Sequence, residues 1–147
     1  MEIKKVVVIG SGTMGSGIAA HLCNANIPVT LLDLKTEISE QARDKIHKSR
    51  PPLLLDKSKI NNIKVGNILD NFDEVKEADW VVEAVVERID IKHDIYKKIF
   101  KKRKKGAIVS SIHHPYLSKY YLNTYQMKKK KIFVLLTFLT LLDIWGY

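Results

Sequence analysis

The sequence predicts an α/β fold built on a doubly wound parallel sheet. Short runs of valine, isoleucine and leucine alternate with helical segments along residues 1–111, as β–α–β units require. The first run leads directly into a glycine-rich turn at residues 10–17. Ligands of such sheets bind beyond the carboxyl ends of the strands, so a site is expected at that edge.

The first expected unit is strand, helix and strand. Residues 3–9 form an apolar run typical of a buried strand, and residues 13–24 read as a helix. A second apolar run at residues 28–32 predicts another strand, which ends in Asp33. Two parallel strands joined by one helix make a complete β–α–β unit.

The alternation continues along the rest of this region. In chain order we expect a helix at residues 36–49, a strand at 63–68, a strand at 78–86, a helix at 89–102 and a strand at 107–110. Pro51-Pro52 closes the first of these helical segments because proline cannot continue a helix. The valine-rich strand at 78–86 is expected to be buried on both faces.

The glycine loop is the clearest functional signal. Gly10 permits a tight turn, Gly12 lets the backbone approach a pyrophosphate, and Gly15 lets the helix pack closely against the strand. Thr13 and Met14 lie between the last two glycines, at the expected helix N-terminus, where free amide groups bind phosphate oxygens. The order of strand, loop and helix predicts a Rossmann-like dinucleotide site.

Asp33 indicates which dinucleotide binds. It lies 18 residues after Gly15, at the end of the second expected strand, where a carboxylate accepts hydrogen bonds from both hydroxyls of the adenosine ribose. The same carboxylate repels a 2′-phosphate, which favours NAD over NADP. Lys35 lies two residues further on and would suit a phosphate, so NADP stays open.

Five segments carry a resemblance to a known family. They are Gly10-Ser11-Gly12-Thr13-Met14-Gly15-Ser16-Gly17-Ile18-Ala19, Leu32-Asp33, Val65-Gly66-Asn67, Asp79-Trp80-Val81-Val82-Glu83-Ala84-Val85-Val86-Glu87 and Gly106-Ala107-Ile108-Val109-Ser110-Ser111. With them, residues 1–111 resemble the NAD-binding domain of the 3-hydroxyacyl-CoA dehydrogenases, specifically of the multifunctional fatty-acid oxidation enzymes. The resemblance implies NAD as cofactor and an acyl-CoA substrate, whose 3-hydroxyl group is oxidised in β-oxidation.

The resemblance also implies further cofactor contacts. In the family, the acid and the lysine that match Glu87 and Lys92 lie near the cofactor, so both are expected to bind it here. Glu83, on the same expected strand, is a weaker candidate. Family members bind coenzyme A partly through a helical region that corresponds to residues 40–60, where the match assigns no individual residue.

The resemblance ends at Ser111. The family continues with Asn-Thr-Ser, which carries a catalytic serine, and later with Thr-His-Phe-Phe-Asn-Pro, which carries the catalytic histidine. Neither string occurs in this chain. Residues 112–147 hold eight of the twelve aromatic residues and a single acid, Asp143. We expect an incomplete NAD-binding domain, truncated at its C-terminal side, then a non-family tail, with no catalytic residue and no activity alone.

A frameshift accounts for the tail. When each codon's third base is grouped with the next two bases, residues 111–118 permit Asn-Thr-Ser-Ser-Ile-Pro-Leu. The same offset over residues 131–146 permits Asp-Phe-Cys-Ile-Thr-His-Phe-Phe-Asn-Pro-Pro-Arg-Tyr-Met-Gly, and the single tryptophan codon of Trp145 forces the final glycine. Both strings are what the family shows next. We infer that one base was lost, or two gained, within the codon for Ser111.

Other readings of the tail assign it no partner. The apolar run at residues 132–142 has eleven residues, fewer than the roughly 20 that a membrane span needs, so no span is expected and an interfacial segment stays open. His113-His114 has no third ligand at a suitable spacing, so no metal site is expected. The rival reading of the whole chain is a self-standing nucleotide-binding module with a basic interaction tail.

Charge and cysteine content limit the remaining partners. The formal net charge is +9, and seven of the nine residues at 97–105 are basic. They fall at an expected helix C-terminus, where cations are favoured, and no aromatic residues alternate with them to stack bases, so no nucleic-acid partner is expected. The single Cys23 excludes an internal disulfide and fits a cytoplasmic protein. The oligomeric state is unknown from the sequence.

The frameshift makes a prediction about the coding DNA. We expect the codons across Ser111 to spell the family strings in the shifted frame, and the missing catalytic half to follow Tyr147 in that frame. Resequencing this stretch checks both. Codons incompatible with the two strings, or unrelated DNA downstream, would favour the self-standing module instead.

Overall fold

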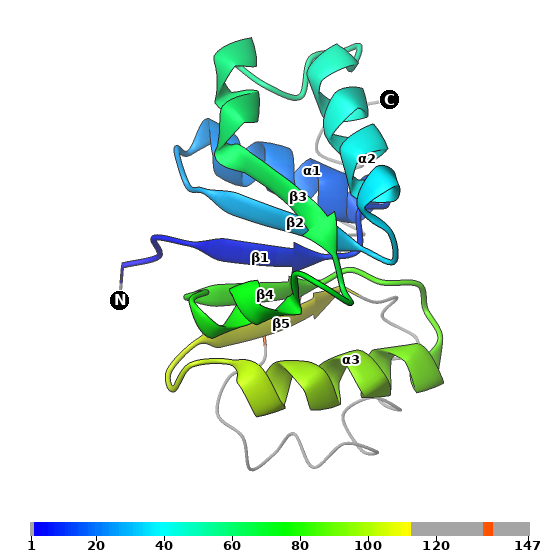
Figure 1. The fold of residues 1–147 in the computed structure, drawn as a ribbon. Helices are drawn as coiled ribbons and strands as arrows, with labels where there is room; N and C mark the ends of the chain where they lie inside the picture. The colour runs from blue at the N-terminus through cyan, green and yellow to red at the C-terminus, as the bar shows by residue number, and fades with distance from the viewer. Residues whose placement is uncertain (1, 113–133, 137–147) are drawn as a thin grey trace.

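A computed structural model describes residues 2–112 and 134–136. Its centre is a parallel sheet with strand order β3-β2-β1-β4-β5-β6 (Figure 1). The strands are β1 (Val6–Ile9), β2 (Val29–Asp33), β3 (Ile63–Asn67), β4 (Trp80–Glu83), β5 (Ile108–Ile112) and β6 (Val134–Leu136). This order is that of a Rossmann-like doubly wound sheet, so the predicted fold class is confirmed.

Helices cover both faces of the sheet, as a doubly wound fold requires. The helices are α1 (Thr13–Asn24), α2 (Thr36–Lys48) and α3 (Ile89–Lys102), and the 3-10 helices are η1 (Lys57–Asn62) and η2 (Phe72–Lys76). Val6 and Val8 of β1 pack in the core shared with α1 and α2. Val7 and Ile9 pack in the core shared with α3 and η2. Successive residues of β1 therefore face the two cores in alternation.

The expected and observed elements differ most at β4. A strand was predicted over residues 78–86, but β4 ends at Glu83. There the Val85 N–H group donates to the Glu83 side chain at 2.9 Å, so the backbone leaves the sheet instead of extending it. Valine content alone does not reveal this turn, because valine suits both a strand and an apolar cleft wall.

The switch point of the sheet lies between β1 and β4. The chain winds from β1 to β2 and β3 on one side, then crosses to β4 and β5 on the other. Ile9 is level with Leu32 of β2 and with Glu83 of β4. Because the three strands end at one level, the loops that follow them open at the same edge, where ligands of this fold class bind.

Most of the predicted tail lies outside the described residues. This includes His113-His114 and, apart from β6, the apolar run at 132–142. Strand β6, which the sequence pattern did not predict, pairs with β5 through Ser110 and Val134. Within the described residues, no helix combines the length and apolar character needed to cross a membrane.

The basic segment at 97–105 is partly neutralised by acids. Lys102 forms an ion pair with Asp73, and Lys104 forms one with Asp79 at 2.5 Å. Hydrogen bonds from Lys102 and then Lys76 lower the pKa of Asp73 to about 2. The carboxylates of Asp73, in η2, and of Asp79, just before β4, therefore offset part of the positive charge at this helix end.

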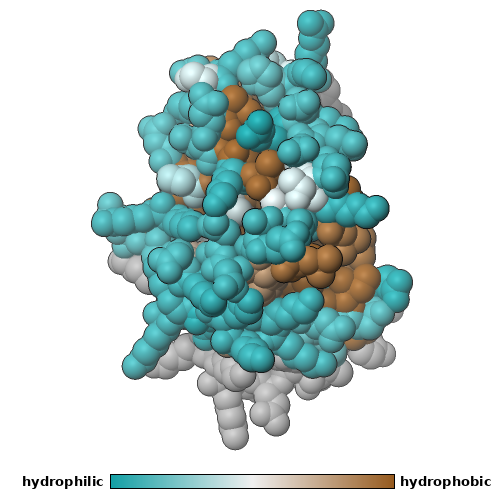
Figure 2. Space-filling view, in the orientation of Figure 1, coloured by the Kyte–Doolittle hydropathy of each residue, from teal (hydrophilic) through white to brown (hydrophobic). Residues whose placement is uncertain are grey.

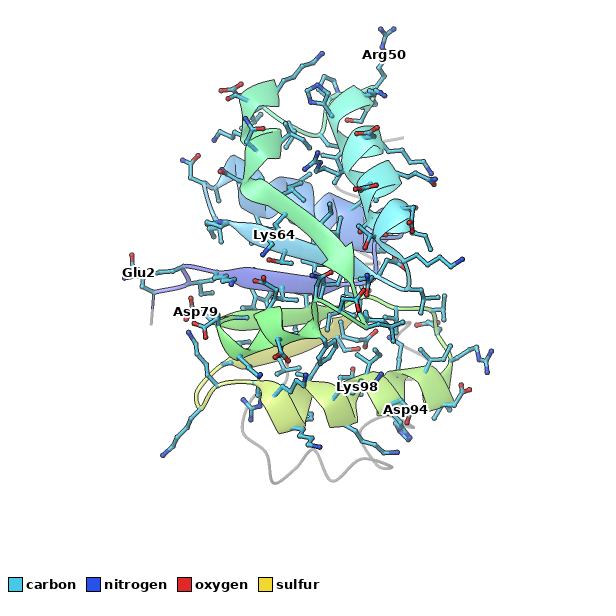
Figure 3. All side chains as sticks on the ribbon, viewed as in Figure 1. Glu2, Arg50, Lys64, Asp79, Asp94 and Lys98 are labelled. Atoms are coloured by element: carbon cyan, nitrogen blue, oxygen red, sulfur yellow. The ribbon has the colours of Figure 1, made fainter. Side chains whose placement is uncertain are left out.

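Asp79 joins three segments at the amino edge of the sheet, where Figure 3 labels it. Its Oδ2 atom accepts hydrogen bonds from the backbone N–H groups of Lys4 at 2.8 Å and Lys5 at 3.0 Å. Its Oδ1 atom accepts one from Lys104 Nζ at 2.5 Å. These bonds, with Lys104 contributing most, lower the pKa of Asp79 from 3.8 to about 2.

The lowered pKa predicts how D79N changes stability with pH. A carboxylate with a lowered folded-state pKa stabilises the fold above its unfolded pKa of 3.8, and this contribution is lost as the pH falls towards about 2. D79N should therefore melt below the unsubstituted chain near neutral pH, and the difference should shrink through this acidic window. Thermal unfolding followed by circular dichroism measures both.

D94N is the matched control, because the Asp94 carboxylate has an exposed lysine partner at 3.4 Å on its own helix. Its melting temperature should stay close to that of the unsubstituted chain throughout. A D79N difference that is constant from neutral to acidic pH would contradict the assignment.

Candidate functional site

A cleft of about 660 Å³ runs along the carboxyl edge of the sheet. The glycine loop and the segments after β2 and β4 line its centre, while α2 and α3 line its two sides. Figure 2 shows apolar surface on this side of the molecule. Exposed Leu34 and Val86, which follow β2 and β4, both line the cleft. The predicted position of the site and the observed cleft therefore coincide.

Two glycines of the loop are required by close backbone approaches. Gly10 has a φ of +103°, and a Cβ atom there would lie 2.4 Å from the carbonyl oxygen of Ala84. A Cβ atom at Gly15 would lie 1.9 Å from the carbonyl oxygen of Gly10. The turn therefore fits between β4 and α1 only without side chains at these positions.

Gly12 has a different environment. Nothing lies within 4 Å of a Cβ atom built there, and its φ of −63° is open to any residue. The fold itself therefore does not require glycine at this position. Since Gly12 also lines the cleft, the free space beside it is available to a ligand.

Helix α1 presents its N-terminus to the cleft. Gly12 is the N-cap residue, so no side chain caps the helix, and no acidic residue lies in its first turn. Thr13 lines the cleft, whereas Met14 is half-buried and is not among the residues that line it. The first amide groups of a helix have no partners within it and carry partial positive charge. The geometry suits a bound phosphate or pyrophosphate.

Asp33 is held beside the glycine loop by Ser11. Its Oδ2 atom accepts hydrogen bonds from the Ser11 N–H group at 2.7 Å and from Ser11 Oγ at 2.6 Å. Its Oδ1 atom accepts one from the Leu34 N–H group at 2.7 Å. Ser16 Oγ in turn donates to the Ser11 carbonyl oxygen at 2.8 Å. Ser11 was not predicted; its only sequence signal was a hydroxyl group between two loop glycines.

The structure places Lys92 and Glu87 in different environments. Lys92 is fully buried, and its Nζ atom donates to both carboxylate oxygens of Glu83 at 2.8 and 3.0 Å. Glu87 is exposed beyond the end of β4. Neither residue is among those that line the cleft. Their expected contact with the cofactor therefore stays a prediction, while Glu83, the weaker candidate, is the residue that pairs with Lys92.

Glu83 also accepts two bonds that sequence reasoning missed. Tyr96 Oη donates to its Oε2 atom at 2.8 Å, and Ser111 Oγ donates to the same atom at 2.5 Å. Tyr96 lies on α3 and Ser111 on β5, so only the fold brings them to Glu83. No local spacing could have identified them.

The expected coenzyme A region borders the same cleft. Lys45 and Ser49, at the end of α2, line it together with Leu53 in the following loop. Asn24 of α1 holds this loop, because its side chain donates to the Leu53 carbonyl oxygen and accepts from the Leu55 N–H group, each at 2.9 Å. The cleft thus extends from the glycine loop along α2.

The described residues favour neither a reactive cysteine nor a metal site. Cys23 is buried in α1, and burial raises the pKa of its thiol to about 11, so it stays protonated near neutral pH. In the described part of the chain, no three histidine, cysteine or acidic side chains group together as metal ligands would.

Comparison with known proteins places this site in a family. The sequence profile described as 3-hydroxyacyl-CoA dehydrogenase, NAD binding domain, matches residues 5–133. The match runs past Ser111, where the sequence-based resemblance ended, and the domain boundary at that residue stays a prediction.

Individual relatives agree with this match. A "Probable 3-hydroxyacyl-CoA dehydrogenase" of Deinococcus radiodurans is 42% identical over 118 residues, which are 76% of this chain and 34% of that protein. The peroxisomal fatty acid beta-oxidation multifunctional protein AIM1 of Arabidopsis thaliana is 35% identical over 115 residues, 74% of this chain and 16% of its own length. This chain therefore spans about a third of the first relative and about a sixth of the second.

A solved structure supports the same assignment. The (S)-3-hydroxybutyryl-CoA dehydrogenase PaaH1 of Ralstonia eutropha superimposes with a TM-score of 0.58 and 26% identity, over 76% of this chain and 41% of that one. The chain belongs to the NAD-binding domain family of the 3-hydroxyacyl-CoA dehydrogenases.

Proposed function

We propose that the cleft binds NAD through the residues that the sequence singled out. The loop of Gly10, Gly12 and Gly15, with the amide groups of Thr13 and Met14, would hold the pyrophosphate. The observation that carries this proposal is the free space at Gly12, beside an uncapped helix N-terminus. A helix end of this kind favours an anion.

The adenosine half of the dinucleotide would bind at Asp33. Its carboxylate lines the cleft and is held in place by Ser11 and Leu34, which supports hydrogen bonds to the ribose hydroxyls. A fixed negative charge there opposes a 2′-phosphate. Lys35 is exposed and is not among the residues that line the cleft, so NAD is favoured over NADP.

The nicotinamide half would then lie on the other side of the glycine loop. Ala84, Val85 and Val86 form the cleft wall there, after the end of β4. Glu87 follows this wall in the chain, and Lys92 lies behind it, so both belong to the same side of the site. We assign them to the nicotinamide end.

In its complete form, the enzyme would oxidise a 3-hydroxyacyl-CoA to a 3-oxoacyl-CoA, with NAD as the hydride acceptor. The arm of the cleft along α2, with Lys45 and Ser49, would admit part of coenzyme A. No histidine lines the described cleft, although histidine is the usual general base. We infer that the described residues bind and orient, and that proton transfer needs groups elsewhere.

Two further assignments accompany this function. We propose a division into an NAD-binding domain at residues 1–111 and a non-family tail at 112–147, on the change of composition at Ser111. We also propose a cytoplasmic location, which the single, buried Cys23 supports because the described residues contain no second thiol for a disulfide.

G12A separates cofactor binding from folding. Alanine fits the Gly12 backbone and meets nothing within 4 Å, so the fold should keep its melting temperature. The added methyl group would occupy the space proposed for the pyrophosphate, so NAD affinity should fall tenfold or more, about 1.4 kcal/mol. Isothermal titration calorimetry with NAD and with NADP measures the loss and the cofactor preference together.

G15A is the matched control, because its methyl group would meet the Gly10 carbonyl oxygen at 1.9 Å. It should cost roughly 2–3 kcal/mol of folding free energy whether or not a ligand is present. If G12A binds NAD as tightly as the unsubstituted chain does, the proposed pyrophosphate site is wrong.

A further inference from the structure

A buried polar cluster lies behind the cleft wall that follows β4. It consists of Glu83, Lys92, Tyr96 and Ser111, and we refer to it as the Glu83 cluster. The Glu83 carboxylate accepts hydrogen bonds from the three other side chains at 2.5 to 3.0 Å. Glu83 and Lys92 are both fully buried.

The energetics of this cluster argue for a role in positioning. Removing two charges from water costs several kcal/mol for each ion, and their attraction recovers this only with good geometry and further hydrogen bonds. A similar volume of apolar side chains often stabilises a core equally well. A buried ion pair is therefore weak evidence for a role in stability. What indicates its role here is the backbone that its hydrogen bonds hold in place.

That geometry connects four segments of the chain. Glu83 ends β4, and its Oε1 atom accepts the Val85 N–H group of the cleft wall at 2.9 Å. Lys92 comes from α3, and its Nζ atom also donates to the Ile112 carbonyl oxygen of β5 at 2.8 Å. The cluster thus fixes the direction in which the backbone leaves β4.

The opposite side of the same wall touches the glycine loop. The Ala84 N–H group donates to the Ile9 carbonyl oxygen at 2.8 Å. The Ala84 carbonyl oxygen lies so close to Gly10 that a Cβ atom built on Gly10 would be 2.4 Å from it. A shift of residues 84–86 would therefore change the width of the cleft beside the loop.

We propose that Glu83 is a positioning residue for the nicotinamide half of the bound dinucleotide, with Lys92 as its buried counter-ion. Glu83 acts through the backbone of residues 84–86 and does not itself line the cleft. This inference rests on the proposed function. The adenosine half lies with Asp33 on β2, on the far side of β1, so its binding does not depend on the Glu83 cluster.

The experiment compares NADH with ADP-ribose, which lacks only the nicotinamide. The main variant is E83Q/K92M, because it removes both charges and leaves neither buried alone. Its affinity for NADH should fall at least tenfold relative to its affinity for ADP-ribose, which should change less than twofold. The fluorescence of bound NADH should also move towards that of free NADH.

Y96F is a milder second variant that keeps both charges. It removes one hydrogen bond to Glu83 and should shift the same ratio in the same direction by a smaller factor. K5M/E74Q is the matched control, because this ion pair of 2.7 Å lies away from the cleft, at the amino edge of the sheet. It should leave the ratio and the NADH emission unchanged.

Three results would overturn the inference. In the first, E83Q/K92M leaves the ratio and the emission unchanged, or weakens both nucleotides equally, as a merely structural cluster would. In the second, the unsubstituted chain binds NADH and ADP-ribose alike without an emission change, so no nicotinamide is held. In the third, it binds neither nucleotide, and then the proposed function itself fails together with this inference.

Discussion

The close approach of the glycine loop to β4 and α1 is the constraint on which the site depends. Gly10 and Gly15 leave no room for side chains, since a Cβ atom would lie 2.4 and 1.9 Å from backbone oxygens. This contact sets the start of α1 against the end of β1 and beside the wall that follows β4. The uncapped N-terminus of α1 therefore points into the cleft, which Gly12 and Thr13 line.

Much of the fold follows from local pattern. The expected bounds of α1 and α3 coincide with the observed helices. The glycine loop and the next apolar run delimit α1, whereas apolar and charged residues alternate clearly along α3. The end of β4 was missed because its cause is a side chain: Glu83 captures the Val85 N–H group. The 3-10 helices η1 and η2 were also missed, since short turns of this kind leave little periodicity.

The candidate site divides in the same way. The glycine loop and Asp33 are recognisable because their spacing is local and each residue type has one evident use. Within the Glu83 cluster, Lys92 and Glu83 were candidates through the family resemblance alone. Tyr96 and Ser111 were not recognisable, because they reach Glu83 across 13 and 28 positions of the chain. A lysine on an amphipathic helix reads as solvated until the fold shows that Lys92 lies on the buried face.

Two carboxylates at the ends of β2 and β4, the strands on either side of β1, show why residue type alone does not assign a role. Asp33 accepts its hydrogen bonds from the neutral donors of Ser11 and Leu34, so its negative charge acts on the cleft that it lines. Glu83 meets the ammonium group of Lys92, so its charge is cancelled inside the core. The cleft wall at residues 84–86 is therefore apolar, and the Glu83–Lys92 ion pair behind it adds no net charge. The charged side of the glycine loop, at Asp33, therefore suits the polar adenosine ribose in the proposed complex. The apolar side, at residues 84–86, suits the face of the nicotinamide ring, and this difference arises from the partners of the two acids.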